Sequence, residues 1–194
     1  MKTIPVVLGT VLLLTLGVTD PIVRKSPAVQ LADGTVYFNR PPDLVGASAT
    51  YKTAYAWNST YAFTLDLLEN AGEPLQRVTI TLKDTPDPVR YFLEETRAFA
   101  RTPDGQTRTL TLEQVTFAPE AQAVTVVFNP PVPPGRTVTI ELRPVENPSG
   151  GVYLFGVTAF PAGEKTYGQF IGYGRIQIND RDYSRFQGPG FFFR

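Results

Sequence analysis

The stretch Ala123–Pro144, AVTVVFNPPVPPGRTVTIELRP, constrains the fold more than any other part of the sequence. Val124, Val126 and Phe128 alternate with smaller or polar residues, and the same alternation returns over 137–143. A period of two in β-branched residues is typical of half-buried β-strands. The prolines between the two runs cannot donate to a sheet ladder, so they cannot lie in a central strand. The stretch therefore predicts two strands joined by a proline-rich turn.

Similar short runs, separated by Gly, Pro and Asp turns, recur along the 194 residues. The clearest cover Thr35–Phe38, Leu75–Leu82, Val152–Phe160 and Phe170–Ile178. Val152–Phe160 is almost continuously apolar, which predicts a strand buried on both faces. Gly172 and Gly174 indicate a bulge or a close backbone approach in the last strand. About eight to nine short strands predict an all-β, immunoglobulin-like β-sandwich, with a closed barrel as the alternative.

Aromatic residues occupy alternate positions in the stretch Tyr51–Leu67, which predicts two strands joined by a bend. The aromatic residues considered as a candidate binding site are Tyr51, Tyr55, Trp57 and Tyr61. They could form an aromatic platform that stacks on sugar rings or another flat ligand. They could also form the core face of a sheet, which is favoured because aromatic stripes at strand spacing usually point inward. The solvent exposure of Trp57 distinguishes the two interpretations.

Two further stretches carry weaker signals. Arg90–Ala100 fits either a short helix or a strand with Tyr91, Leu93 and Phe99 inward, and its all-β neighbours favour the strand. The run Asn147–Gly151, NPSGG, predicts a flexible loop.

The N-terminus has the pattern of an export signal. Lys2 precedes the uncharged apolar run Ile4–Val18, which is shorter than the about 20 residues that span a bilayer. Gly17-Val18-Thr19 is a poor cleavage site, so an uncleaved segment that tethers the chain to a membrane stays open. We divide the chain into a signal peptide or hydrophobic N-terminal segment over 1–27, a β-sandwich over 28–178 and an aromatic C-terminal tail over 179–194.

The chain has no histidine and no cysteine. It therefore cannot form a disulfide, a thiolate nucleophile or a Ser-His-Asp triad, and it lacks the commonest transition-metal ligand. Glycoside hydrolysis by a pair of carboxylates needs neither residue and is therefore not excluded. The candidates are Glu94, Glu95 and Glu120, but no sequence pattern places two of them across a cleft. The net charge of zero gives no basic surface for nucleic acid. We expect no catalytic residue, no metal, no cofactor and no enzymatic activity.

Four long stretches together resemble one known family: Val29–Val45, Leu67–Ile80, Phe128–Pro148 and Gly150–Ile176. The family consists of exported cyanobacterial proteins and is known as a domain of unknown function, DUF 2808. The resemblance implies export and a cyanobacterial source, and it brings no catalytic residues. The Phe-rich end of the tail is not part of the family pattern.

These patterns suggest a non-enzymatic protein of the cell envelope or extracellular matrix with a structural or adhesive role. It would be exported to the periplasm, the cell surface or the medium, and it would contact a membrane only through an uncleaved N-terminal segment. Its partners would be copies of itself, as in a filament, or envelope proteins. The tail residues Phe191, Phe192 and Phe193 are the candidate assembly residues. The alternative function is a secreted module that binds polysaccharide through the aromatic platform.

Overall fold

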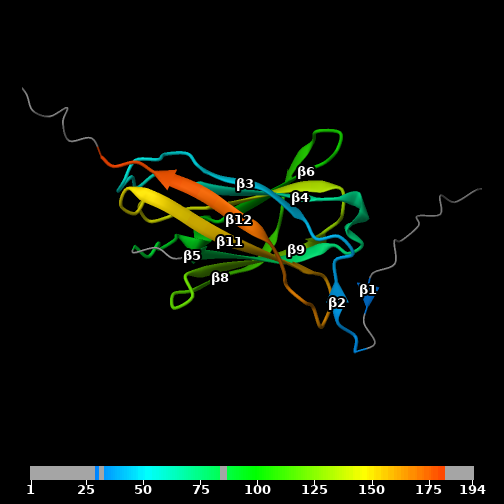
Figure 1. The fold of residues 1–194 in the computed structure, drawn as a ribbon. Helices are drawn as coiled ribbons and strands as arrows, with labels where there is room; N and C mark the ends of the chain where they lie inside the picture. Colours follow the sequence, from blue (N-terminus) through cyan, green and yellow to red (C-terminus); the bar gives the residue numbers. More distant parts are fainter. Residues whose placement is uncertain (1–28, 31–32, 84–86, 182–194) are drawn as a thin grey trace, which may run out of the picture.

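The computed structural model describes residues 29–30, 33–83 and 87–181 as two five-stranded antiparallel sheets packed face to face (Figure 1). The first sheet has the order β3-β4-β10-β6-β7, with bounds Asp43–Ala49, Tyr61–Leu67, Arg136–Leu142, Arg97–Arg101 and Thr107–Thr109. The second has the order β12-β11-β5-β9-β8, with bounds Gln169–Ile178, Gly151–Pro161, Leu75–Lys83, Ala123–Val132 and Leu112–Ala118. The short strands β1 (Val29–Gln30) and β2 (Val36–Tyr37) pair with each other, and two 3-10 turns are η1 (Glu69–Ala71) and η2 (Leu93–Glu95).

This architecture confirms the predicted all-β, immunoglobulin-like sandwich. The two sheets are separate, so the structure is not the alternative closed barrel. The described residues contain twelve strands rather than eight to nine, because several of them are only two or three residues long. Such short strands leave too few alternating residues to stand out in a sequence.

The central stretch forms two strands, as predicted, but the strands do not pair. β9 lies in the second sheet and β10 in the first, so residues 133–135 carry the chain from one layer to the other. The prediction that the prolines lie outside a central strand is wrong for Pro130 and Pro131, because β9 lies between β5 and β8 and extends to Val132. The register with β5 shifts at this end and the pairing with β8 ends at Phe128, so neither proline is needed as a ladder donor. Val124, Val126 and Phe128 are buried, which confirms the predicted inward face of β9. Alternation along one strand sets which side chains point inward, but it does not choose the sheet in which the strand pairs.

Aromatic contacts between the layers mark the middle of the core. Phe155 of β11 packs edge-on against Phe63 and Tyr61 of β4, with ring centroids 5.2 and 5.9 Å apart. All three side chains are buried. Burial of large aromatic side chains in edge-to-face contact stabilises the packing of one sheet on the other.

β11 is buried on one face only, so the predicted burial of Val152–Phe160 on both faces is wrong. Val152 and Leu154 are exposed, while Tyr153 and Phe155 lie in the core. The sandwich has two layers, and no described element covers the outer face of the second sheet. The outer face of β11 and β12 is therefore an exposed apolar surface, to which Phe170 and Tyr173 also belong.

The edges of the two sheets meet closely where β12 passes β3. A Cβ added at Gly174 would lie 2.6 Å from the Cβ of Ala47, so only glycine fits there. The register of β11 and β12 shifts between Val157 and Thr158, opposite Gly172 and Phe170. The predicted bulge and the predicted close backbone approach are thus both present.

Two sequence-based predictions of local structure are only partly confirmed. Residues 51–60 form a loop of turns rather than the first of two strands, and only β4 follows the predicted alternation. In the stretch 90–100, η2 precedes β6, and Phe99 is half-buried on the outer face because Ala98 and Ala100 occupy the inward positions. The small alanines fill the core here, and the aromatic ring faces out.

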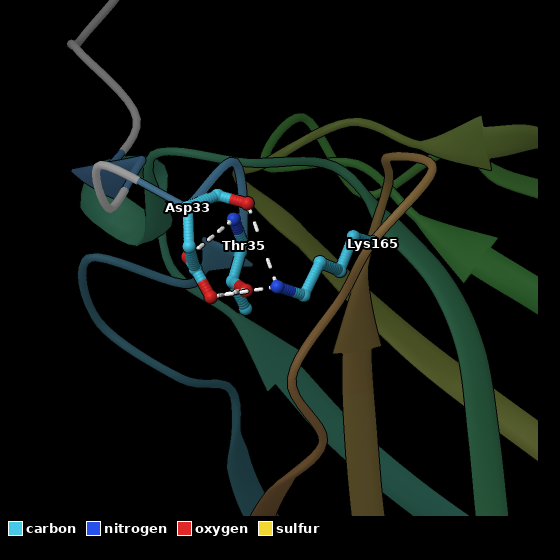
Figure 2. Close-up of polar contacts among 3 residues, drawn as sticks. All are labelled: Asp33, Thr35 and Lys165. Atoms are coloured by element: carbon cyan, nitrogen blue, oxygen red, sulfur yellow. Dashed lines mark hydrogen bonds and ion pairs between the residues drawn. The ribbon is translucent and has the colours of Figure 1, made fainter.

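The β1–β2 pair is attached to the second sheet by the loop after β11 (Figure 2). The amide of Val36 donates to the carbonyl of Lys165 at 2.9 Å. The Lys165 ammonium lies 2.6 Å from the carboxylate of Asp33, which also accepts two hydrogen bonds from Thr35 at 3.0 Å. These donors lower the pKa of Asp33 from 3.8 to about 2, with the hydrogen bond from Lys165 as the largest cause and those from Thr35 next.

This arrangement predicts an acid-dependent attachment. The pKa of Asp33 is lower in the folded chain than its ordinary 3.8, so its stabilising contribution is complete above about pH 4 and is lost as the pH falls toward about 2. A ¹³C NMR titration of the Asp33 carboxyl measures this directly. Lys165→Met is expected to move the titration up toward 3.8, whereas Lys52→Met leaves it unchanged. A wild-type titration already near 4 would contradict the contact.

The predicted signal segment 1–27 and the tail residues Phe191, Phe192 and Phe193 lie outside the described residues. Their roles stay predictions, as do the predicted domain boundaries. No helix among the described residues is long and apolar enough to cross a membrane.

Candidate functional site

A loop rich in exposed aromatic side chains closes one end of the sandwich. We call residues 50–60, between β3 and β4, the aromatic loop; in Figure 1 it is the cyan segment beside the end of β12. The exposed fraction is 52% for Tyr51, 49% for Tyr55 and 70% for Trp57. Large aromatic side chains are seldom this exposed together in a folded domain, so the loop is a candidate contact surface.

A buried asparagine from a distant part of the sequence holds this loop in place. Asn147 is fully buried, and its side-chain amide donates to the carbonyls of Tyr51 and Thr53 at 3.0 and 2.8 Å. Its Oδ1 accepts a hydrogen bond of 3.0 Å from the Tyr61 hydroxyl. Three hydrogen bonds to one buried side chain fix the path of the loop.

Backbone contacts reinforce the same attachment. The amide of Tyr55 donates to the Asn147 carbonyl at 3.1 Å, and the Asn147 amide donates to the carbonyl of Ala56 at 2.8 Å. The amide of Ala54 donates to the carbonyl of Asn179, just beyond β12, at 2.8 Å. The loop is therefore pinned by two segments far away in the sequence, which presents its aromatic side chains on a fixed backbone.

The structure places the four candidate aromatic residues in two different settings. Tyr51, Tyr55 and Trp57 are exposed on the loop, whereas Tyr61 lies in the core with an exposed fraction of 1%. Burial raises the pKa of the Tyr61 hydroxyl, and the nearby Tyr153 adds to this shift. Tyr61 therefore supports the loop from below and is not available for stacking on a ligand.

A cavity of about 230 Å³ lies directly beside the aromatic loop. Tyr55 forms one wall, and Arg90, Glu146 and Ser149 supply polar groups around it. The Ser149 hydroxyl donates to the carboxylate of Asp87, another lining residue. An aromatic ring beside hydrogen-bonding groups is the combination by which proteins recognise sugar rings, since the ring stacks and the polar groups fix orientation.

The carboxylates considered for glycoside hydrolysis lie away from this cavity lining. Glu94 and Glu95 belong to η2, where Glu95 pairs with Arg143 at 3.2 Å, and Glu120 lies in the turn between β8 and β9. The described part of the chain has no group of three or more Asp or Glu side chains arranged to hold a metal ion.

Sequence reasoning missed Asn147, which it assigned to a flexible loop. Asn147 and Pro148 are instead buried, and the asparagine organises the whole end of the domain. An asparagine before a proline is a turn signal in any sequence. Its partners in the loop, Tyr51 and Thr53, are 96 and 94 residues away along the chain, so no local pattern could reveal these contacts.

The fold and the site define an immunoglobulin-like β-sandwich with an aromatic loop at one end. The chain belongs to the family described as "Protein of unknown function (DUF2808)", whose model matches residues 35–178. The predicted family is thereby confirmed, while the cyanobacterial source stays a prediction. A comparison with curated proteins gives no match.

The solved structures with a similar fold include a pilus backbone protein, an AgI/II polypeptide and a collagen adhesin. The backbone protein of the group B streptococcus pilus 2b is 14% identical, covers 70% of this chain and 57% of its own, and gives a TM-score of 0.42. The C-terminal domain of the Streptococcus agalactiae AgI/II polypeptide BspA is 11% identical, with coverages of 71% and 50% and a TM-score of 0.44. The collagen adhesin of S. aureus is 7% identical, with coverages of 69% and 48% and a TM-score of 0.41. This chain thus spans about half the length of these proteins, and such distant likeness carries no argument about its function.

Proposed function

We propose that this domain is a non-enzymatic adhesive module that binds polysaccharide through the aromatic loop. The observation that carries the proposal is the exposure of Tyr51, Tyr55 and Trp57 on a loop fixed by the buried Asn147. A fixed loop loses little conformational entropy on binding, and exposed aromatic rings supply contact area for sugar rings. The polar cavity beside Tyr55 offers hydrogen bonds to the hydroxyls of a neighbouring sugar.

Export to the periplasm, the cell surface or the medium is part of the same proposal. It is supported by Lys2 and the apolar run Ile4–Val18, which precede the folded domain. The chain has no cysteine and no histidine, which supports a binding role over the common kinds of hydrolytic catalysis.

Glycan binding by the domain and its variants tests this function. The wild-type domain is expected to retain a subset of polysaccharides on a glycan array, and Trp57→Ala is expected to weaken the retained ligand at least about tenfold because central aromatic residues dominate binding energy. Tyr173→Ala is the matched control, since Tyr173 is also an exposed aromatic residue but lies on the outer face of β12. Equal binding by Trp57→Ala and the wild type would refute the assignment of the site.

A structural role, in which copies of the chain assemble, is the second candidate. It is favoured by the exposed apolar outer face of β11 and β12, which includes Leu154, Phe170 and Tyr173. Sedimentation velocity over a wide concentration range distinguishes the candidates, because a subunit of this kind would form concentration-dependent assemblies.

A further inference from the structure

A second cavity, of about 270 Å³, opens at the opposite end of the sandwich from the aromatic loop. It lies between the β6–β7 hairpin and the proline-rich connection from β9 to β10. β4 spans the distance between the two ends, since it begins at Tyr61 under the aromatic loop and ends at Leu67, opposite Arg136. Leu110, Pro131 and Val132 contribute to a mainly apolar lining.

Two arginines face this cavity from positions that the strand pleat directs toward the core. Arg108 of β7 lies opposite Ala100, and Arg136 of β10 lies opposite Leu67. Directly opposed residues of antiparallel strands project from the same face of the sheet. Ala100 and Leu67 are both buried in the core, so both arginines project from the inner face of the sheet. Arg136 is half-buried there, and Arg108 is exposed because β7 is exposed along its whole length.

Neither arginine is neutralised by an ion pair. Among the described residues, no carboxylate oxygen lies within 4.0 Å of either guanidinium. Asp104 and Glu69 line an adjoining wider cleft together with both arginines, but neither belongs to the lining of the smaller cavity. The pKa of Asp104 is lowered chiefly by the hydrogen bond from Thr102, and the charge of Arg136 contributes least.

Protection of a sheet edge does not account for both residues. An inward-pointing charge on an edge strand prevents pairing with other chains, and β7 is an edge strand, so this explains Arg108. β10 lies between β4 and β6 and has no free edge, so Arg136 needs a different explanation. Two guanidinium groups without ion-pair partners can bind an anionic group, and the apolar surface below them can contact an apolar face of the same ligand.

We propose that this cavity binds the carboxylate or sulfate group of an acidic sugar residue in a polysaccharide. The guanidinium groups of Arg108 and Arg136 would pair with the anion, and the apolar face of the sugar ring would pack on Leu110 and Pro131. The volume is close to the lower end of the ~300–1,000 Å³ typical of small-molecule pockets, which suits a single sugar ring. The site is independent of the aromatic loop, and the proposal does not rest on the function assigned there.

Calorimetric titration of the full domain with two defined probes tests the proposal. The probes are an oligogalacturonate of about three residues, which carries carboxylates, and a sulfated dextran oligomer. Wild-type domain is expected to bind at least one of them, and Arg108→Gln and Arg136→Gln are each expected to weaken that binding about tenfold, as for the loss of a charge-assisted hydrogen bond. Arg101→Gln is the matched control, because Arg101 lies on the neighbouring strand but outside the lining of this cavity.

The contradicting outcomes are distinct. Binding that is unchanged in the double variant Arg108→Gln/Arg136→Gln would overturn the site. Binding of a fully methyl-esterified oligogalacturonate as tight as that of the free acid would also overturn it. Inorganic sulfate that binds as tightly as either oligomer would reduce it to a simple anion site and overturn the assignment to polysaccharide. No binding of either probe to the wild type would also refute it. Melting temperatures of all variants, and Arg136→Lys, which retains the charge, separate loss of binding from loss of folding.

Discussion

Asn147→Ala is expected to lower the free energy of unfolding by about 3 kcal/mol, as measured by urea denaturation. The substitution removes three side-chain hydrogen bonds in a fully buried position. It leaves the buried hydroxyl of Tyr61 without this partner, and a buried polar group left unsatisfied costs about 1–3 kcal/mol. The carbonyls of Tyr51 and Thr53 keep hydrogen bonds of 2.9 Å from the Ser59 hydroxyl and 3.3 Å from the Ala56 amide, so losing the asparagine costs less at these two groups.

The same substitution at Asn58 is the matched control. Asn58 lies on the aromatic loop but is exposed, so Asn58→Ala is expected to change stability by less than about 0.5 kcal/mol. Tyr61→Phe deletes one of the three hydrogen bonds and is expected to fall between the two. An Asn147→Ala protein as stable as the Asn58→Ala protein would show that Asn147 does not hold the loop.

Phe155→Ala is expected to destabilise the domain by about 3–5 kcal/mol, the usual cost of truncating a buried phenylalanine. Phe155 is fully buried and contacts Phe63 and Tyr61 across the two layers, so its loss leaves a cavity between the sheets. Equilibrium denaturation measures the change, and an unchanged denaturant slope would show that the fold is retained.

The neighbouring residue supplies the control for this prediction. Leu154 points to the exposed outer face of β11, so Leu154→Ala is expected to cost less than about 1 kcal/mol. A one-residue slip in the register of β11 would exchange the two faces. A larger effect at Leu154 than at Phe155 would therefore contradict the register described for β11 and β12.

The sequence predicted the inward face of β9 correctly, but it did not predict which strands lie beside each other. Val124, Val126 and Phe128 are buried as predicted, because alternation is a local property of each strand. The placement of β9 and β10 in different sheets depends on long-range packing. The proline-rich turn is compatible with this placement, but its sequence does not predict it. The apolar run in β11 likewise could not reveal that only one of its faces is covered, since that depends on the number of layers.

The sequence predicted only part of the candidate site. Tyr51, Tyr55 and Trp57 stood out as aromatic residues at alternate positions, but the same pattern included Tyr61, which belongs to the core. The loop leaves the strand pattern because Asn147 captures its carbonyls from a distant part of the chain. The arginines at the other end were invisible for the same reason, since only the strand register brings Arg108 and Arg136 to one cavity.

Fluorescence of Trp57, the single tryptophan of the chain, tests the central claim most directly. The account predicts a red-shifted emission that acrylamide quenches almost as strongly as it quenches a free tryptophan derivative, together with high anisotropy from the fixed loop. It also predicts that a bound polysaccharide protects Trp57 from quenching. A blue-shifted emission that resists acrylamide in the native, ligand-free domain would place Trp57 in the core and contradict the account.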